Sequence, residues 1–227
     1  MSNVLAIGDP HAPSMLPYYP KFCKRIYEEY NCNRVVIMGD GADWHSISYH
    51  FPKARGHRDP EREYLAAKKQ IQQLYKLFPK ATYLVGNHSD LPKRRADDIG
   101  LPQEIIRDFN ELWDVPSWEV VPRFCDKIID NVIYRHGDKG RGGQRNAAYN
   151  NAIYEGKSVV QGHYHAQLAV EYYANAHTRI FGMQVGTGVD HRKATMDYGK
   201  KFSAKPIVGC GVIVGGNRAY VEPMLKR

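Results

Sequence analysis

Short apolar runs, each followed by a polar cluster, alternate along most of this chain with longer stretches of mixed character. The runs occupy residues 4–8, 35–38, 83–85, 132–134 and 159–160. Runs of this length bounded by glycine and polar residues are typical of buried strands. Because helical patterns separate them, the sequence predicts an α/β architecture.

The clearest predicted helix begins at Asp59-Pro60-Glu61. This triplet offers an N-cap, a proline at the first helical position and an acidic first turn. Apolar residues then follow at the spacing of one helix stripe: Tyr64, Ala67, Ile71, Leu74, Tyr75 and Phe78. Further helices are predicted at 18–30, 103–112 and 145–154, and strands at 179–185, 207–214 and 219–222. A hairpin turn is predicted at Gly215-Gly216-Asn217.

The chain contains no internal repeat, no low-complexity tract and no linker rich in Pro, Gly or Ser. Its polar clusters extend from residue 9 to residue 165, so a site built from them needs both halves folded together. We therefore expect residues 1–227 to form a single domain.

Composition excludes some classes of protein. Apolar residues make up 43% of the chain, and no apolar run approaches the roughly 18–20 residues that cross a bilayer. The first residues resemble a buried strand rather than an export signal, and the four cysteines show no CxxC spacing. We expect a cytoplasmic protein with reduced thiols and no membrane contact.

The formal net charge of +8 favours an anionic partner. Nucleic acid is the first candidate, and a phosphorylated small molecule would also benefit. The basic residues are spread over several segments, without a long Lys/Arg block. Charge alone therefore leaves both partners open.

Five polar clusters follow the five apolar runs, either directly or after one residue. They are Asp9-Pro10-His11, Gly39-Asp40-Gly41-Ala42-Asp43, Gly86-Asn87-His88, His136-Gly137-Asp138 and Gly162-His163-Tyr164-His165. Nearly all their polar side chains are types that hold divalent metal ions. Any one cluster alone is weak evidence of a site, because most such triplets are surface turns. Five in order, each at a strand end, predict a metal-dependent hydrolase.

The residue types also suggest how ions would be held. Asp9 and His11, and likewise His163 and His165, can face one ion together if the backbone is extended. Asp40 can bridge two ions, because a carboxylate has two oxygens. An oxygen and nitrogen ligand set without thiolate suits Mn²⁺ first, with Fe, Zn²⁺ or Ni²⁺ as alternatives. Two ions about 3.5–4 Å apart would clamp a phosphoryl group and activate water near neutral pH.

The clusters resemble the signature of the calcineurin-like metallophosphoesterases: DxH, GDxxD, GNH, a lone His before Gly, and GHxH. The resemblance covers residues 9–165 in order. It implies a four-layer fold, with two mixed β-sheets in a sandwich flanked by α-helices. Compact members encoded by tailed bacteriophages and related bacterial genomes look most similar.

The resemblance also implies roles for individual residues. It implies one ion held by Asp9, His11, Asp40 and His165, and a second held by Asp40, Asn87, His136 and His163. His88 matches the general acid, and Asp43 matches a residue that supports a histidine or fixes the loop. The third cluster departs from the family pattern, because Ser89 stands where an acidic residue is usual. Asp90 could then serve one position later.

Several residues beside the clusters are candidates for substrate binding. They are Arg94 and Arg95 after the third cluster, Arg141 and Arg145 after the fourth, and His45 after the second. Asp43-Trp44-His45 stands where protein Ser/Thr phosphatases have Asp-Arg-Gly, which argues against that branch. We predict hydrolysis of nucleic-acid or nucleotide phosphodiesters. The alternatives are a phosphomonoesterase for phosphometabolites or phosphoproteins and, more remotely, a non-catalytic scaffold.

Overall fold

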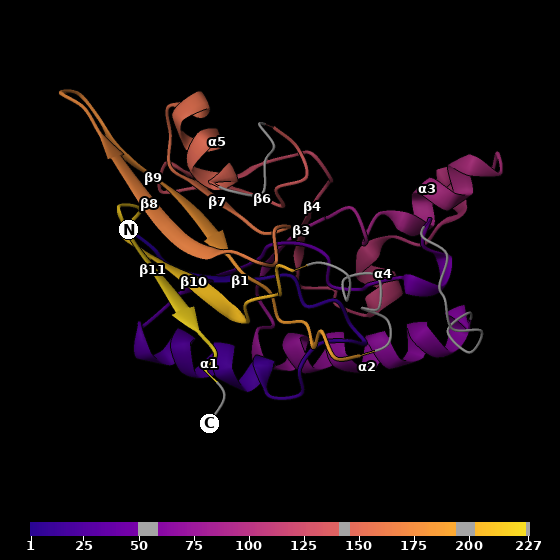
Figure 1. Ribbon diagram of the computed structural model, residues 1–227. Coiled ribbons are helices and arrows are strands. Elements are labelled where there is room, and N and C mark those ends of the chain that lie inside the picture. The colour runs from indigo at the N-terminus through magenta and orange to yellow at the C-terminus, as the bar shows by residue number, and fades with distance from the viewer. Residues whose placement is uncertain (50–58, 141–145, 194–202, 226–227) are drawn as a thin grey trace.

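Two mixed β-sheets pack face to face between helices in the computed structural model of the protein (Figure 1). The structure describes residues 1–49, 59–140, 146–193 and 203–225. Helices α1 and α2 run along one outer side of the sheets, and α5 covers the other. The order of layers is therefore helix, sheet, sheet, helix, and the predicted four-layer α/β fold is confirmed.

The first sheet has the strand order β11-β10-β1-β2-β3-β4. Its parallel strands are β1 (Asn3–Ile7), β2 (Arg34–Ile37), β3 (Thr82–Leu84) and β4 (Glu119–Val121). Its antiparallel strands are β10 (Gly209–Val214), which pairs with β1, and β11 (Arg218–Pro223). The first three polar clusters thus follow neighbouring parallel strands and meet at one edge of the sheet.

The second sheet has the order β5-β6-β7-β9-β8. Its parallel core consists of β6 (Val132–Arg135), β7 (Val159–Gln161) and β9 (Arg179–Val185). The edge strands β5 (Lys127–Ile129) and β8 (Leu168–Ala174) are antiparallel to their neighbours. The fourth and fifth clusters follow β6 and β7, again at one end of the sheet.

Helices close the outer faces. On the first sheet lie α1 (Tyr19–Glu29), α2 (Pro60–Leu77) and α4 (Phe109–Trp113), and on the second lies α5 (Ala147–Glu155). Further helices are α3 (Leu91–Asp98) and the short 3-10 helices η1 (His45–Ile47) and η3 (Gln103–Ile105). Within the described residues, no helix combines the length and the apolar character needed to span a bilayer.

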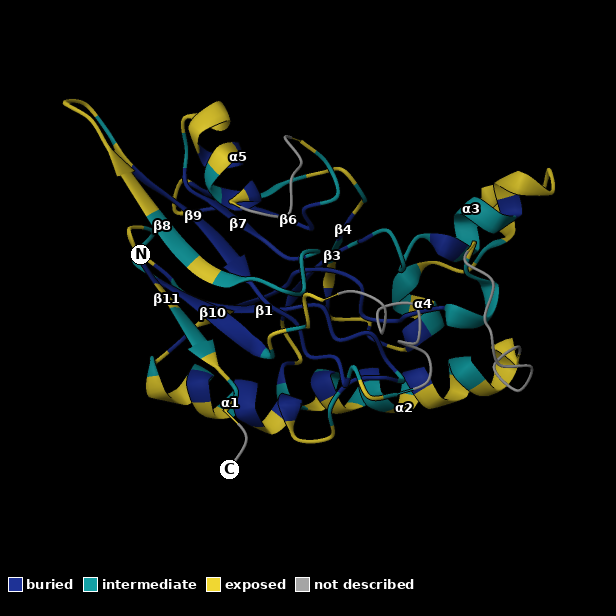
Figure 2. Cartoon of the chain, in the orientation of Figure 1, coloured by how far each residue is buried: buried dark blue, intermediate teal, exposed yellow. Residues whose placement is uncertain are grey.

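The alternation of side chains along β1 shows why its apolar run is continuous. Leu5 and Ile7 pack against the helices below the first sheet. Val4 and Ala6 point the other way and pack against residues of the second sheet such as Met183. Because both faces of the strand are covered there, every position from Val4 to Ile7 is apolar. Figure 2 shows these central strands buried and the outer helix faces exposed.

Several sequence predictions of local structure are confirmed. Asp59 caps α2, since its carboxylate accepts a hydrogen bond from Arg62 N at 2.9 Å. The strand predicted at 179–185 has those bounds, and the hairpin turn joins β10 to β11. The helix predicted at 103–112 is wrong: η3 ends at Ile105, Ile106 is extended, and α4 begins after Asp108.

Other elements were not predicted at all. The charged segment holding Arg94 and Arg95 forms helix α3. Strands β4, β5 and β8 were also missed, and all three lie at sheet edges. An edge strand has one unpaired side and is often half-exposed, so its sequence lacks the continuous apolar run of a buried strand.

Close packing of α5 on the second sheet can be tested at Gly182. A Cβ built there would lie 2.3 Å from Tyr149 Cα, so the helix would have to move away from the sheet. We expect Gly182→Ala to lower the free energy of unfolding by about 3 kcal/mol in chemical denaturation. Gly100→Ala is the control, because no atom lies within 4 Å of its Cβ. Its φ of +72° should cost only about 1 kcal/mol. An equal or smaller loss at Gly182 would contradict this packing.

Candidate metal centre

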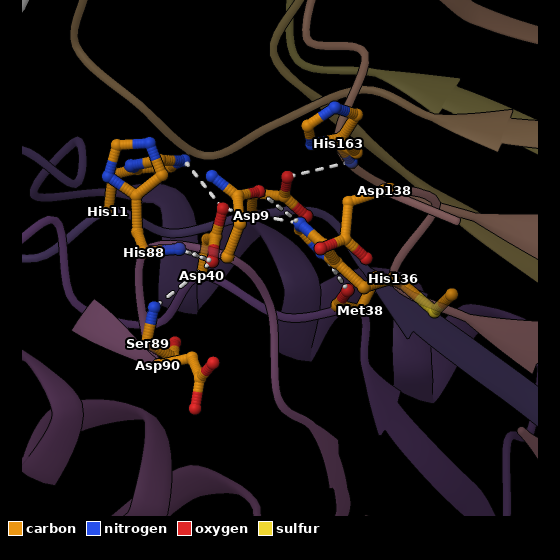
Figure 3. A network of polar contacts seen from close by, with 12 residues as sticks. Asp9, His11, Met38, Asp40, His88, Ser89, Asp90, His136, Asp138 and His163 are labelled. Carbon is orange, nitrogen blue, oxygen red and sulfur yellow. Dashed lines mark hydrogen bonds and ion pairs between the residues drawn. The ribbon is translucent and has the colours of Figure 1, made fainter. Parts of the chain in front are cut away.

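The five polar clusters converge where the carboxyl ends of the two sheets meet. Backbone hydrogen bonds join the first two loops, from His11 N to the Asp40 carbonyl at 2.8 Å. Across the sheets, His163 N donates to Asp9 Oδ2, also at 2.8 Å. Figure 3 shows His11 and His163 on opposite sides of Asp9 and Asp40. Residues far apart in sequence thus surround one point.

Turns of left-handed backbone aim these side chains. His11, Asp40 and His163 have φ values of 48°, 40° and 69°. The extended backbone that would let each of the pairs Asp9–His11 and His163–His165 face one ion is therefore not present, because one histidine of each pair lies in a left-handed turn. Non-glycine residues seldom adopt this conformation, and where they do it often marks a functional site.

One group of candidate ligands consists of Asp9, His11 and His165. His11 Nε2 lies 3.1 Å from His165 Nε2, and His165 Nε2 lies 3.3 Å from Asp9 Oδ2. Asp9 and His11 are fully buried, and His165 is partly exposed.

A second group consists of Asp40, His136 and His163. His136 Nε2 lies 3.0 Å from Asn87 Oδ1 and 3.3 Å from Asp40 Oδ2. Asp40 Oδ2 is also 3.9 Å from His11 Nε2 in the first group. Asp40 therefore lies between the two groups, and His163 and His165 belong to different ones.

The histidine tautomers fit bound cations. The Nδ1 atoms of His11 and His136 lie 2.8 Å from acceptors, which are the Asp43 carboxylate and the Met38 carbonyl. Each Nδ1 must donate, so in the neutral ring each Nε2 presents a lone pair to the centre. There the lone pair of His136 faces the oxygen of Asn87. Two acceptors at this distance repel each other unless a proton or a cation lies between them.

Two glycines leave room for the carboxylates. A Cβ at Gly162 would lie 2.3 Å from Asp9 Oδ1, and a Cβ at Gly86 would lie 2.3 Å from Asp40 Oδ1. Among the described residues, Asp9 Oδ1 is buried and accepts no hydrogen bond. A buried carboxylate oxygen without a donor is costly unless a cation balances it. The oxygen and nitrogen donors together fit divalent metal ions.

The electrostatics follow from crowding these groups in a buried place. Burial disfavours ionisation of Asp40, but His136 and His88 outweigh it and hold the pKa of Asp40 well below its usual range. Burial likewise opposes protonation of His136, yet Asp40 and Asp9 raise its pKa to about 10. His11 differs, because burial lowers its pKa. The carboxylates of Asp40 and Asp9 thus favour positive charge at the centre, beside Asp40.

His88 and Asp43 lie beside the two groups. His88 Nδ1 donates to the Asp43 carbonyl at 2.8 Å. The other ring nitrogen, Nε2, does not take part in this hydrogen bond. The Asp43 carboxylate contacts His88 Nδ1 at 3.2 Å as well as His11. Burial opposes the charge of His88, but Asp40 and Asp43 raise its pKa to about 9. Asp43, rather than Asp90, orients this histidine.

Tyr83 is a site residue that the sequence analysis missed. Its buried hydroxyl accepts from Gly41 N at 2.7 Å and shares a 2.5 Å hydrogen bond with Ser89 Oγ. One phenol thus ties the loop after Asp40 to the loop after His88. A tyrosine in a buried strand next to a polar cluster needs a partner for its hydroxyl, and that was the available signal.

Arg123 was also missed. It donates to Asp138 Oδ2 at 2.8 Å and to Asp90 Oδ2 at 3.1 Å. Asp90 therefore binds Arg123, and the expectation that Asp90 orients His88 is wrong. Asp90 and Arg123 join the third cluster's loop to the fourth, and Asp138 completes this link.

The predicted substrate-binding residues have varied surroundings. Arg95 donates to the carbonyls of Ile47 and Ser48 at 2.7 and 2.8 Å, which holds η1 against α3. The guanidinium of Arg94 lies 4.7 Å from the ring centre of Tyr49.

The backbone N of His45 donates to Glu63 Oε1 at 2.6 Å, so this histidine lies at the start of η1 against α2. Arg141 and Arg145 lie outside the described residues. Substrate contacts for all five predicted residues stay predictions.

Comparisons with known proteins give a distant likeness of structure. No protein-family model matches the sequence, and no curated protein matches it. Similar solved structures include the E. coli phosphoesterase YfcE, with 14% identity over 92% of this chain and 87% of that chain and a TM-score of 0.47. Vacuolar protein sorting 29 from Cryptosporidium parvum has 14% identity, coverage of 99% and 98%, and a TM-score of 0.47. The Pseudomonas putida nuclease MPE has 14% identity, coverage of 97% and 86%, and a TM-score of 0.32. At such values these proteins indicate nothing about the activity of this chain.

The link through Tyr83 can be measured by stability. Tyr83→Phe removes the hydroxyl and leaves Gly41 N–H and Ser89 Oγ without this buried partner. We therefore expect the free energy of unfolding to fall by about 1–3 kcal/mol. Tyr75→Phe is the control, because its 3.0 Å bond to Ser117 is exposed and its loss should change little. Equal effects in urea denaturation would mean that the Tyr83 hydroxyl does not hold the loops.

Proposed function

We propose that this protein is a phosphoesterase dependent on two divalent metal ions, and a member of the calcineurin-like superfamily. The observation that supports this most directly is Asp40, whose carboxylate adjoins both groups of candidate ligands. One ion would be held by Asp9, His11, Asp40 and His165, and the other by Asp40, Asn87, His136 and His163. Mn²⁺ is the first candidate for both ions.

Such ions, when bound, polarise phosphoryl oxygens and lower the pKa of coordinated water to about 7. The residues of the chain supply the rest. Asp40 fixes the spacing of the two groups, and His11 and His136 present Nε2 because their Nδ1 atoms are engaged. His88, held by Asp43, gives its Nε2 proton to the departing oxygen of the ester. One water is consumed, because its oxygen bonds to phosphorus as the P–O bond to the alcohol breaks, and the products are an alcohol and a phosphate with one ester bond fewer.

The proposed substrates are phosphodiesters of nucleic acids or nucleotides in the cytoplasm. The net charge of +8 supports them, because it draws polyanions toward the protein. We further propose that all 227 residues form one domain of the compact type found in tailed phages, since the ligands come from both halves of the chain. A strong preference for phosphomonoesters over diesters would contradict this choice of substrate.

The bridging role of Asp40 predicts coupled loss of metal and turnover. We expect Asp40→Asn to bind less than half the Mn²⁺ of the wild type and to cleave bis(4-nitrophenyl) phosphate about a thousandfold more slowly or worse. Elemental analysis after dialysis and a colorimetric assay measure the two quantities. Asp97→Asn is the control, because its carboxylate contacts Gln103 away from the centre. Full activity of Asp40→Asn would rule the proposal out.

The role of His88 predicts a loss that depends on the leaving group. An alkoxide needs a proton on departure, whereas 4-nitrophenolate leaves readily without one. We expect His88→Ala to retain its Mn²⁺ and to cleave thymidylyl-thymidine about 10²- to 10⁴-fold more slowly, with a smaller loss on the nitrophenyl ester. His177→Ala, on the exposed β8–β9 hairpin, is the control. Equal losses on the two esters would exclude proton donation by His88.

A further inference from the structure

Phe124 occupies an unusual place in a tight turn. Cys125 N donates to the Pro122 carbonyl at 3.1 Å, so Arg123 and Phe124 are the central residues of a four-residue turn. Phe124 is the second of them and has a φ of 66°. A positive φ at this position of a turn is normally supplied by Gly or Asn, because a larger side chain is strained there.

Burial does not explain why a phenylalanine is found in this turn. Its side chain is 52% exposed with respect to the described residues. The ring packs against Arg123, whose guanidinium carbon lies 4.4 Å from the ring centre. A glycine would relieve the backbone strain, and folding would lose little apolar burial. A strained, exposed aromatic residue of this kind is often retained for function.

The turn is joined through Arg123 to two loops of the candidate metal centre. Arg123, which covers one side of the Phe124 ring, is joined to Asp90 and Asp138. Those carboxylates are each two residues beyond a site histidine, His88 and His136 respectively. Lys139 Nζ donates to the Phe124 carbonyl and fixes the turn from the other side. The exposed ring is therefore attached through Arg123 to the loops that follow His88 and His136.

We propose that Phe124 stacks on a nucleobase of the substrate while the adjoining phosphodiester lies at the metal centre. This rests on the proposed function and narrows its substrate class to nucleotides with an unpaired base. An exposed aromatic ring beside basic groups suits single-stranded nucleic acid, because every base offers a face for stacking. Arg123, itself held by Asp90 and Asp138, packs on the ring and fixes its position.

Two esters with the same leaving group test the proposal. They are thymidine 5′-(4-nitrophenyl phosphate), which has a base, and ethyl 4-nitrophenyl phosphate, which has none. With Mn²⁺, we expect Phe124→Gly to raise KM for the thymidine ester about 5- to 150-fold and to leave the ethyl ester unchanged. Its Tm should stay the same or rise, because glycine accepts the positive φ.

Companion variants separate stacking from a structural role. Phe124→Trp should keep the low KM for the thymidine ester, since indole also stacks. Tyr154→Ala removes a 66% exposed aromatic residue on α5 and should change neither KM. A lower Tm in Phe124→Gly, together with equal losses on both esters, would show a structural role and overturn the proposal.

The remaining outcomes are also decisive. An equal rise in KM for both esters at unchanged Tm would place the ring on the leaving group and overturn base stacking. If the wild type cleaves both esters and Phe124→Gly is unchanged on both, stacking is wrong while the proposed function stands. If the wild type cleaves neither ester with Mn²⁺, the proposed function fails and the stacking proposal fails with it.

Discussion

The carboxylate of Asp40 is the interaction on which the candidate site depends. Its Oδ1 accepts hydrogen bonds from His88 N at 2.8 Å and Ser89 N at 3.3 Å, and its Oδ2 faces His136. It therefore organises the loop after β3 and, at the same time, faces a ligand from the second sheet. A buried charge with so many partners is stable only when all of them are in place. This makes the geometry of the site a property of the whole fold.

The local backbone is strained to achieve this geometry. His11, Asp40 and His163 all adopt left-handed conformations, and glycines at 86 and 162 leave space where any side chain would strike a carboxylate. Such features lower stability by themselves. The two sheets, with apolar contacts on both faces of β1, provide the rigid support that holds them. The packed sheets thus support the strained loops of the site.

A layer of polar contacts surrounds the candidate ligands. Tyr83 joins the second and third loops, and Arg123 joins the third and fourth. Neither residue belongs to a recognisable motif. Each connects groups that are far apart in sequence, and each leaves a candidate ligand or proton donor less free to move. Exact placement of metal ligands and catalytic groups commonly depends on such outer contacts.

The sequence by itself determined the fold class, most of the buried strands and the identity of the clustered polar residues. It could do so because strand burial and helix capping are local effects, as the apolar run of β1 and the cap at Asp59 show. Only the tertiary structure decided that His11 and His163 lie in left-handed turns, that Asp43 rather than Asp90 orients His88, and that Arg95 holds η1. The turn at Phe124 likewise became visible only in three dimensions. These features depend on backbone turns and on contacts between distant segments, and the spacing of residues along a chain does not specify them.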